Sequence, residues 1–156
     1  MKFILLVALL SAVAISQSPS LWPVKFQQDF VESYTTSPFY TAGKLYYDTE
    51  RNMERFDRTD GKAVPICSSI VSESTPCQQL TRDGKRYIVF PFKRLCCMCC
   101  DAAHGCGVLK RDWLKNAKYV GKEDISGQTF NKFVDTEGKI DYWATTDSDQ
   151  IPRRLI

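Results

Sequence analysis

The hydrophobic and polar positions of the chain predict a series of short β-strands. Runs rich in Tyr, Phe, Ile and Val alternate with turn-forming pairs such as Asp83-Gly84 and Glu137-Gly138. Short strands that recur at intervals of roughly 8–12 residues are typical of an antiparallel sheet in which consecutive strands pair. The segments with this pattern are 45–47, 53–58, 86–90, 123–125, 129–134, 139–145 and 151–156.

Three other segments have a different or an ambiguous pattern. Phe26, Phe30 and Tyr34 recur at intervals of four residues, which fits one stripe of a helix or one face of a strand equally well. Residues 63–82 contain two prolines and a Ser/Thr-rich middle, so we expect a loop there. Residues 108–118 are expected to form one short helix.

The first residues have the pattern of a secretory signal peptide. Lys2 precedes the apolar run 3–10, and small residues that include Ala12-Val13-Ala14 follow it. The run is too short for a membrane-spanning helix, which needs about 20 apolar residues, and a buried N-terminal helix is the alternative. We therefore expect residues 1–16 to be removed and residues 17–156 to form a single secreted, β-rich domain.

Composition and charge exclude several classes of protein. Of the 156 residues, 44% are hydrophobic and 25% are charged, close to ordinary globular values. This composition excludes a disordered tail, a collagen-like rod and a polytopic membrane protein. The net charge of +3 comes without any run of five Lys or Arg residues, so we expect no nucleic-acid partner.

Seven cysteines are many for a chain of this size, and in an exported protein they predict disulfide bonds. We expect three bridges and one remaining thiol, in a pairing that the sequence does not determine. A Cys67–Cys77 bridge would close a loop of 11 residues, worth about 2.8 kcal/mol in the chain-entropy model. If the cluster is extended, Cys96 and Cys100 face one way and the cysteines between them face the other. The candidate disulfide residues are Cys67, Cys77, Cys96, Cys97, Cys99, Cys100 and Cys106.

Other chemistry at the cysteine cluster is less favoured. Two overlapping C-x-x-C spacings, together with His104 and Cys106, offer zinc-ligand types, but the second cysteine pair of a zinc ribbon is missing. A redox C-x-x-C needs a βαβ setting, and a Cys–His nucleophile pair needs an unbridged thiol. The motifs of serine hydrolases, phosphate-binding loops and zinc proteases do not occur in the sequence. We therefore assign no catalytic residue and no metal ligand, and we expect a protein that is not an enzyme.

Paired carboxylates offer a second type of metal site. Asp57 with Asp60, and Asp147 with Asp149, present the oxygen ligands that Ca²⁺ prefers. Aspartates in turns more often cap backbone N–H groups, and this is the interpretation we favour.

Aromatic residues occupy both faces of several predicted strands, as in Tyr46-Tyr47 and Tyr142-Trp143. An open antiparallel sheet needs only one buried face. The pattern therefore fits either a core with scattered exposed tyrosines or a curved sheet that lines an apolar cavity. The candidate wall residues of such a cavity are Tyr47, Phe56, Phe90, Phe130, Phe133 and Trp143.

A succession of motifs resembles a known group of secreted proteins. Gly43-Lys-Leu-Tyr-Tyr-Asp48 is followed by Asn52-Met-Glu-Arg-Phe-Asp57 and, further on, by Val120-Gly-Lys-Glu-Asp-Ile-Ser-Gly127. Asp141-Tyr-Trp-Ala-Thr145 and Ile151-Pro-Arg-Arg-Leu155 complete the series. In this order the motifs resemble the ependymin-related proteins and the wider group with the LolA-like half-barrel fold.

The resemblance implies a curved antiparallel half-barrel sheet with short helical cover and an apolar pocket for lipid or another hydrophobic ligand. It also implies secretion or residence in a lysosome-like lumen, calcium binding as the one cofactor, and a homodimer. No calcium ligand of the family can be placed on this sequence.

The sequence departs from the family pattern at two places. The cluster Cys96-Cys-Met-Cys-Cys100 is not an ependymin hallmark and is more similar to a cysteine-rich subgroup of uncharacterised secreted proteins. Further closing strands are expected after residues 151–156, so either the sheet is smaller or the sequence is a fragment that is incomplete at its C-terminus.

These observations support three hypotheses about function. The leading one is a non-catalytic protein, secreted or in the lumen of a lysosome-like compartment, that binds a hydrophobic, lipid-like ligand in a half-barrel pocket. The second is a structural or adhesive extracellular module that is cross-linked through cysteines. The third, a Cys- or zinc-dependent enzyme, is a distant alternative.

Overall fold

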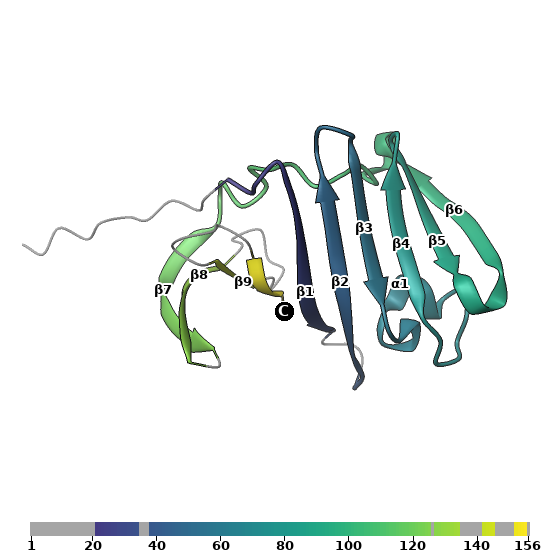
Figure 1. Cartoon of the computed structure of the whole chain (residues 1–156), viewed down its shortest axis with the longest axis horizontal. Coiled ribbons are helices and arrows are strands. Elements are labelled where there is room, and N and C mark those ends of the chain that lie inside the picture. The colour runs from purple at the N-terminus through teal and green to yellow at the C-terminus, as the bar shows by residue number, and fades with distance from the viewer. Residues whose placement is uncertain (1–20, 35–37, 126, 135–141, 146–151, 156) are drawn as a thin grey trace, which may run out of the picture.

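The computed structural model describes residues 21–34, 38–125, 127–134, 142–145 and 152–155, which form two antiparallel sheets (Figure 1). The larger sheet has six strands in chain order, and the smaller sheet has four in the order β10-β9-β8-β7. The strands of the larger sheet are β1 (Lys25–Ser33), β2 (Tyr40–Asp48), β3 (Met53–Arg58), β4 (Cys77–Arg82), β5 (Lys85–Phe90) and β6 (Leu95–Asp101). Those of the smaller sheet are β7 (Lys118–Ile125), β8 (Gln128–Val134), β9 (Tyr142–Thr145) and β10 (Pro152–Leu155).

The predicted mainly β, antiparallel fold is confirmed, and most predicted strands are present. Phe26 and Phe30, whose spacing also fitted a helix, belong to strand β1. The confirmed segments are 45–47, 53–58, 86–90, 123–125 and 129–134, with parts of 139–145 and 151–156. The predicted signal peptide and the predicted turns at 137–138 and 147–149 lie outside the described residues.

The expectation of a loop throughout residues 63–82 is wrong, because the segment ends in strand β4. Few of its residues favour a strand on their own. Strand β4 lies between β3 and β5 and pairs with both along its length. Its conformation is therefore fixed by two neighbouring ladders rather than by its own propensity.

The predicted helix at 108–118 is also wrong. The turns there are closed by short bonds such as Trp113 N–H to the Lys110 carbonyl and Ala117 N–H to the Leu114 carbonyl. Backbone groups of Leu109 instead bond to side chains of the sheet, which competes with a regular helix. The helices among the described residues are all short: η1 (Gly61–Ala63), α1 (Pro65–Ser68), η2 (Pro91–Lys93) and η3 (Ala102–His104).

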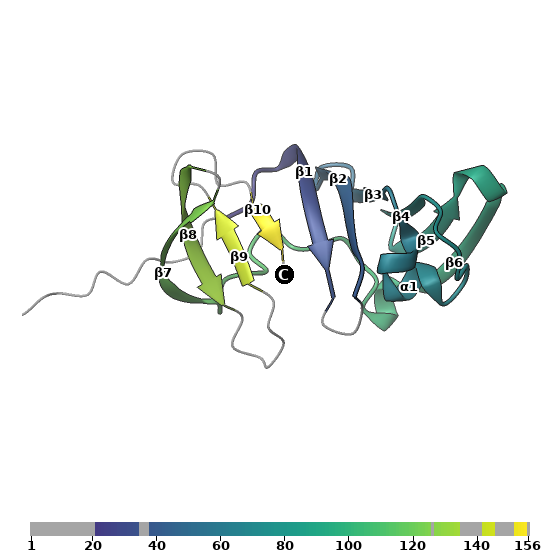
Figure 2. The same ribbon diagram turned by 90° about the horizontal axis from the view of Figure 1, so that it is seen from below.

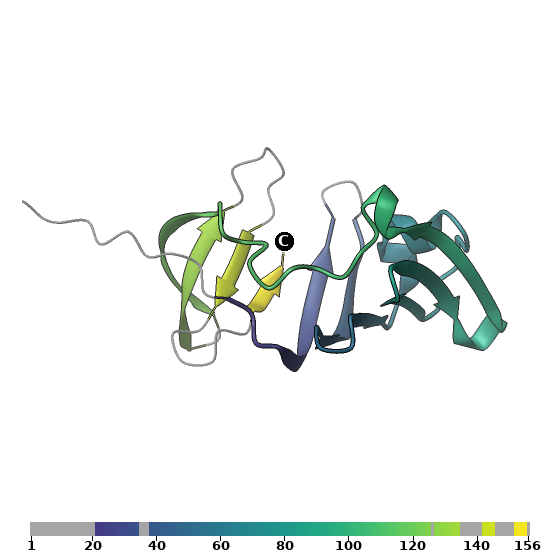
Figure 3. The same cartoon turned by 90° about the horizontal axis from the view of Figure 1, so that it is seen from above.

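One face of the larger sheet is covered by the segment 107–117, which we call the cover segment. In Figure 3 it runs in green from the end of β6 across β1 and β2 towards β7. Trp22 makes edge-to-face contacts with Tyr47 and Trp113, at 5.2 and 5.5 Å between ring centroids. The cluster beneath the cover segment contains Trp22, Leu45, Tyr47, Phe56 and Leu114, with Phe26, Phe30, Val108, Leu109, Trp113 and Ala117 packed against it.

A second cluster lies further along the same face, where η1 and α1 pack on β4 and β5. The Cys67–Cys77 disulfide ties α1 to the start of β4. A side chain at Gly61 would meet the β-carbons of both bridged cysteines within about 3 Å, so only glycine fits beside the bridge. The buried members of this cluster are Val64, Cys67, Cys77, Ile88 and Phe90.

The smaller sheet buries Phe130 and Phe133. Its edge strand β10 lies beside β1 of the larger sheet (Figure 2). No hydrogen-bonded ladder joins these two strands in the described part of the chain, and no closed barrel is formed there. The half-barrel curvature therefore stays a prediction. None of the described helices is long and apolar enough to cross a membrane.

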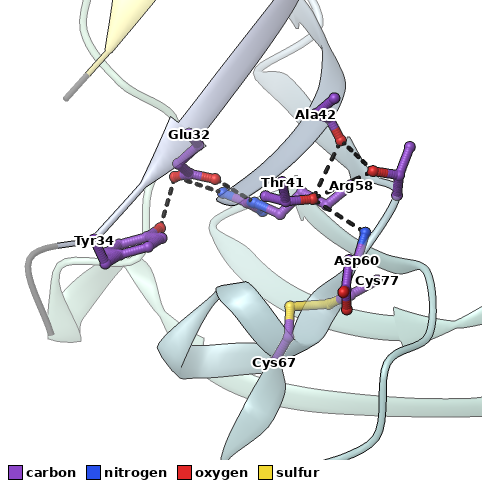
Figure 4. A network of polar contacts seen from close by, with 9 residues as sticks. Glu32, Tyr34, Thr41, Ala42, Arg58, Asp60, Cys67 and Cys77 are labelled. Carbon is purple, nitrogen blue, oxygen red and sulfur yellow. Dashed lines mark hydrogen bonds and ion pairs between the residues drawn. A yellow bond between two sulfur atoms is a disulfide. The ribbon is translucent and has the colours of Figure 1, made fainter. Parts of the chain in front are cut away.

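A buried ion pair lies between the two clusters (Figure 4). Arg58 donates from Nε and Nη2 to the two carboxylate oxygens of Glu32, at 2.7 and 3.3 Å, and both side chains are almost fully buried. The Tyr34 hydroxyl donates to the same carboxylate at 2.6 Å. Burial and the Glu32 charge raise the pKa of Tyr34 above its ordinary value, so this hydroxyl remains a donor. The network joins β1 to β3 across β2.

Removing the cation from this network should destabilise the fold. We expect Arg58→Met to lower the free energy of unfolding by about 3–5 kcal/mol, because the Glu32 carboxylate is then buried without its partner. Arg58→Met combined with Glu32→Gln should recover part of the loss. Denaturant unfolding followed by tryptophan fluorescence measures both. Lys44→Met, which removes an exposed pair with Asp29, is the control. If Arg58→Met and Lys44→Met lowered the free energy of unfolding equally, the buried pair would not have the role described.

Candidate functional site

The candidate site is a groove on the face of the larger sheet opposite the two core clusters. Its volume is about 560 Å³, within the roughly 300–1,000 Å³ of small-molecule sites. Apolar groups come from Tyr46, Met53 and Leu80, on three adjacent strands. The full lining is Lys25, Phe26, Gln27, Tyr46, Tyr47, Asp48, Arg51, Met53, Glu54, Arg55 and Leu80.

Strand register assembles this lining from residues far apart in the sequence. Tyr46 lies opposite Arg55, and Arg55 lies opposite Leu80 on the next strand. Because directly opposite residues share a face, the row continues from Leu80 to Tyr87 on β5 and then to Met98 on β6. The row is half-buried except for Met98, which is exposed. It gives the sheet a second, partly apolar surface.

The rim of the groove is positively charged. Lys25, Arg51 and Arg55 line it, and Asp48 is the carboxylate that faces them. Asp48 lies 3.5 Å from the Lys25 ammonium and 3.9 Å from the Arg51 guanidinium. The Arg55 guanidinium lies 4.4 Å from the centre of the Tyr46 ring, a cation–π geometry. Arg55 is paired with Asp57 at 2.9 Å, whereas Lys25 and Arg51 share the single carboxylate of Asp48. Two cations around one carboxylate leave the rim able to attract an anionic group.

The remaining carboxylate of the lining, Glu54, is directed to the other face. It accepts hydrogen bonds from the Thr81 hydroxyl and the Leu109 backbone N–H, both at 3.2 Å. The Tyr47 hydroxyl donates to the Leu109 carbonyl at 2.6 Å. Burial raises the pKa of Glu54, and burial next to Glu54 raises the pKa of Tyr47 to about 12. These two side chains hold the cover segment, and the Glu54 carboxylate is turned away from the rim of the groove.

The structure does not bring the predicted wall residues together in one cavity. Tyr47 and Phe56 belong to the core under the cover segment, and Phe90 belongs to the core under α1. Phe130 and Phe133 are buried on the smaller sheet. Of these five, Tyr47 alone borders the groove. Trp143 belongs to strand β9, and its side chain lies outside the part of the chain that the structure describes.

The cysteines are paired differently from the expectation of three bridges. All seven lie within the described residues, and the bridges are Cys67–Cys77 and Cys100–Cys106. Cys96, Cys97 and Cys99 are unbridged. The expected third bridge is therefore absent, and three thiols remain instead of one.

The predicted facing of the cluster is wrong as well. Cys97 pairs with Ile88 and Cys100 with Arg86, which places Cys97 and Cys100 on the same face. A β-bulge between these pairs changes the alternation, because Cys99 is inserted as an extra residue.

The described residues contain no cluster of side chains that fits either of the metal sites considered from the sequence. No group of three or more His, Cys, Asp or Glu side chains there is placed to hold a metal ion. His104 contacts Asp101 at 2.6 Å on the exposed turn after β6. Asp57 pairs with Arg55 at 2.9 Å, and Asp60 accepts from the Lys62 N–H as the cap of η1. The capping interpretation is therefore confirmed for Asp60, whereas Asp147 and Asp149 lie outside the described residues.

Sequence reasoning missed most of the groove. The sequence pattern predicts Tyr46 as an aromatic on the second face of its strand, but it predicts a loop at Leu80, which belongs to strand β4. Strand register places Lys25 and Met53 opposite Asp48, and Arg51 reaches the groove from the β2–β3 turn. The available signal is the period of two in β2, which places Tyr46 on the face opposite the buried Leu45 and Tyr47.

Replacing Glu54 should change how stability depends on pH. A carboxyl whose pKa is higher in the folded state binds its proton more tightly there, so its contribution to stability is largest at low pH and is lost as the pH rises through the folded pKa. We expect Glu54→Gln to be more stable than the wild type at neutral pH, with the difference vanishing near the ordinary Glu pKa of about 4.3. Denaturant unfolding across this pH range measures it. Glu50→Gln, in the exposed β2–β3 turn, should show no such trend. If the difference in stability between Glu54→Gln and the wild type were the same at all pH values, the raised pKa of Glu54 would be refuted.

Comparisons with known proteins leave this site to be interpreted from its own geometry. No protein-family model matches the chain, and no curated protein matches it either. The likeness to ependymin-related and LolA-like proteins therefore remains an expectation that rests on the order of the sequence motifs. The function has to be argued from the groove, its charges and the cysteines of β6.

Proposed function

We propose that this chain is a non-catalytic, secreted or lumenal protein that binds a hydrophobic, lipid-like ligand. The proposed binding site is the groove over β1–β4, in place of a cavity walled by Phe56, Phe90, Phe130 and Phe133. A disulfide-linked domain is compatible with an exported protein, because such bridges persist in oxidising compartments.

The apolar surface on the second face of the sheet is the observation that carries the proposal. A single-layer face of an antiparallel sheet is ordinarily polar where it meets water. Here Tyr46, Leu80 and Tyr87 belong to one row across β2–β5, in which Arg55 of β3 lies between Tyr46 and Leu80 and stacks its guanidinium on the Tyr46 ring. A ligand that covers this row would remove apolar surface from water, at about 25 cal/mol for each Å² buried.

The charges at the rim favour an amphiphile with an anionic head group. An acyl chain would lie over Tyr46 and Leu80, and the head group would meet Lys25 and Arg51. Because exposed cations are hydrated in the free protein, they add little to the affinity. They mainly attract the anionic head group and orient the ligand in the groove. A long-chain fatty acid has the simplest chemistry of this type.

Uptake of a fluorescent long-chain fatty acid tests the proposal. We expect Tyr46→Ala to bind about tenfold more weakly, since a buried aromatic side chain is worth about 1.5–3 kcal/mol. We expect Leu80→Glu to abolish binding, because it places a charge among the apolar lining. Tyr40→Ala and Val31→Glu lie on the same face of the sheet but outside the lining, and they should bind as the wild type does.

Thermal unfolding of the four variants separates loss of binding from loss of fold. A wild-type protein that takes up no fatty acid would overturn the proposed function. Equal binding by Leu80→Glu and Val31→Glu would overturn the position of the site.

A second candidate function is favoured by the edge strand of the larger sheet. Strand β6 has one unpaired side among the described strands, and it carries the unbridged, exposed thiols of Cys96 and Cys99. Unpaired strand edges are sites of association, and thiols in an oxidising compartment form bridges. A structural or adhesive module would use this edge to form a covalent homodimer or larger array.

Non-reducing electrophoresis of the purified protein distinguishes the two candidate functions. A cross-linked module should migrate as a dimer or a ladder that collapses on reduction. Cys96→Ser combined with Cys99→Ser should then migrate as a monomer, whereas Cys97→Ser, which changes the less exposed thiol, should retain the dimer. A wild-type monomer without reductant would eliminate the cross-linked module.

A further inference from the structure

Cys99 occupies an unusual position on strand β6. Tyr87 pairs with Met98 and Arg86 pairs with Cys100, so that Cys99 has no partner of its own on β5. It is the inserted residue of a β-bulge, a feature that bends a strand and redirects a side chain. The redirected thiol is exposed and unbridged.

The bulge places this thiol against a disulfide. The Sγ atom of Cys99 lies 3.4 Å from the Sγ atom of Cys100, which is bonded to Cys106. The same thiol lies 3.5 Å from the Arg86 carbonyl oxygen, which fixes its direction. Disulfides exchange when a thiolate attacks one of the two sulfur atoms, and access of the thiol to that sulfur is a condition of the reaction. Here the attacking and the attacked sulfur are already in contact.

We propose that this segment is a thiol–disulfide exchange site, in which Cys99 attacks the Cys100–Cys106 disulfide at Cys100. The new bond joins the sulfur atoms of Cys99 and Cys100, and the bond between Cys100 and Cys106 breaks. Cys106 leaves as the thiolate and takes up the proton that Cys99 gave to solvent. The step conserves the number of disulfides and thiols, so it needs no oxidant or reductant.

The product determines how the site behaves. A bond between neighbouring cysteines closes a small, strained ring, so the Cys106 thiolate can attack it and restore the original bridge. While the bridge is open, Cys106 is a thiol at the start of the cover segment, and that end of the segment has lost its covalent tie to β6. The exchange therefore makes a buried cysteine available to a thiol or disulfide of another molecule. Cys96 and Cys97 lie farther from the bridge along β6, which leaves Cys99 as the attacking group.

Cleavage between Cys100 and Asp101 reads out the position of the bond. The monomeric wild type is incubated at about pH 8.5, where about half of an ordinary thiol is thiolate, and then quenched with acid and denatured. The thiols are blocked with N-ethylmaleimide, and the chain is cut with trypsin and with an endoproteinase that cleaves before aspartate. The original bridge keeps peptide 95–100 linked to the peptide that contains Cys106. After exchange these two peptides separate, and Cys106 carries one blocking group.

We expect blocked Cys106 to accumulate during incubation of the wild type and to be lost in Cys99→Ser. Cys96→Ser, on the same strand, should behave as the wild type. Far-ultraviolet circular dichroism and tryptophan fluorescence verify that both variants fold. Two outcomes would overturn the proposal: Cys106 that is never blocked in the wild type, or Cys106 that is blocked to the same extent in Cys99→Ser.

Discussion

The structure depends on how one face of the larger sheet is covered. A six-stranded antiparallel sheet presents two faces, and its strands cannot bury both without further layers. Here the covering layer is not a long helix but an irregular segment, held by side chains of the sheet itself. Tyr47 donates to the carbonyl of Leu109, and Glu54 accepts from its N–H. The N–H and the C=O of one residue of the cover segment are thus bonded to β3 and β2, respectively.

This arrangement has a cost that the nearby charges partly offset. Glu54 is buried, and an isolated buried carboxylate is strongly unfavourable. Its two hydrogen bonds and the neighbouring Arg58 and Arg86 favour the ionised form, although burial remains the larger effect. Arg58 also balances Glu32, so the two carboxylates of this face share one region of positive charge. With these charges turned inward, Tyr46, Arg55 and Leu80 make up the outward face, and the groove is a consequence of how the core is closed.

The parts of the fold that could be predicted from the sequence are those that depend on interactions between residues near one another in the chain. Strands whose own residues favour them, such as 53–58 and 86–90, were predicted, as was the pairing of consecutive strands. Strand β4 was missed because its conformation comes from two neighbouring ladders, and the groove was missed with it, since Leu80 faces Arg55 only in that register. The helix expected at 108–118 failed because bonds to Tyr47 and Glu54 outweigh a local preference. Cys99 was misplaced because a single inserted residue reverses the alternation that the prediction assumed.

The two disulfides tie the elements that cover the core to the sheet, and they do not join paired strands to each other. Strands are joined by continuous hydrogen-bonded ladders, whereas α1 and the cover segment have no ladder and are held by apolar contacts and, for the cover segment, by a few hydrogen bonds at Leu109 and Arg111. Cys67–Cys77 joins α1 to β4, and Cys100–Cys106 joins the start of the cover segment to β6. A small domain buries a limited share of its surface, so covalent ties are most useful where contacts are fewest. A thiol in contact with one of these two bridges therefore acts on the layer that closes the core, while the hydrogen-bonded sheet beneath it remains intact.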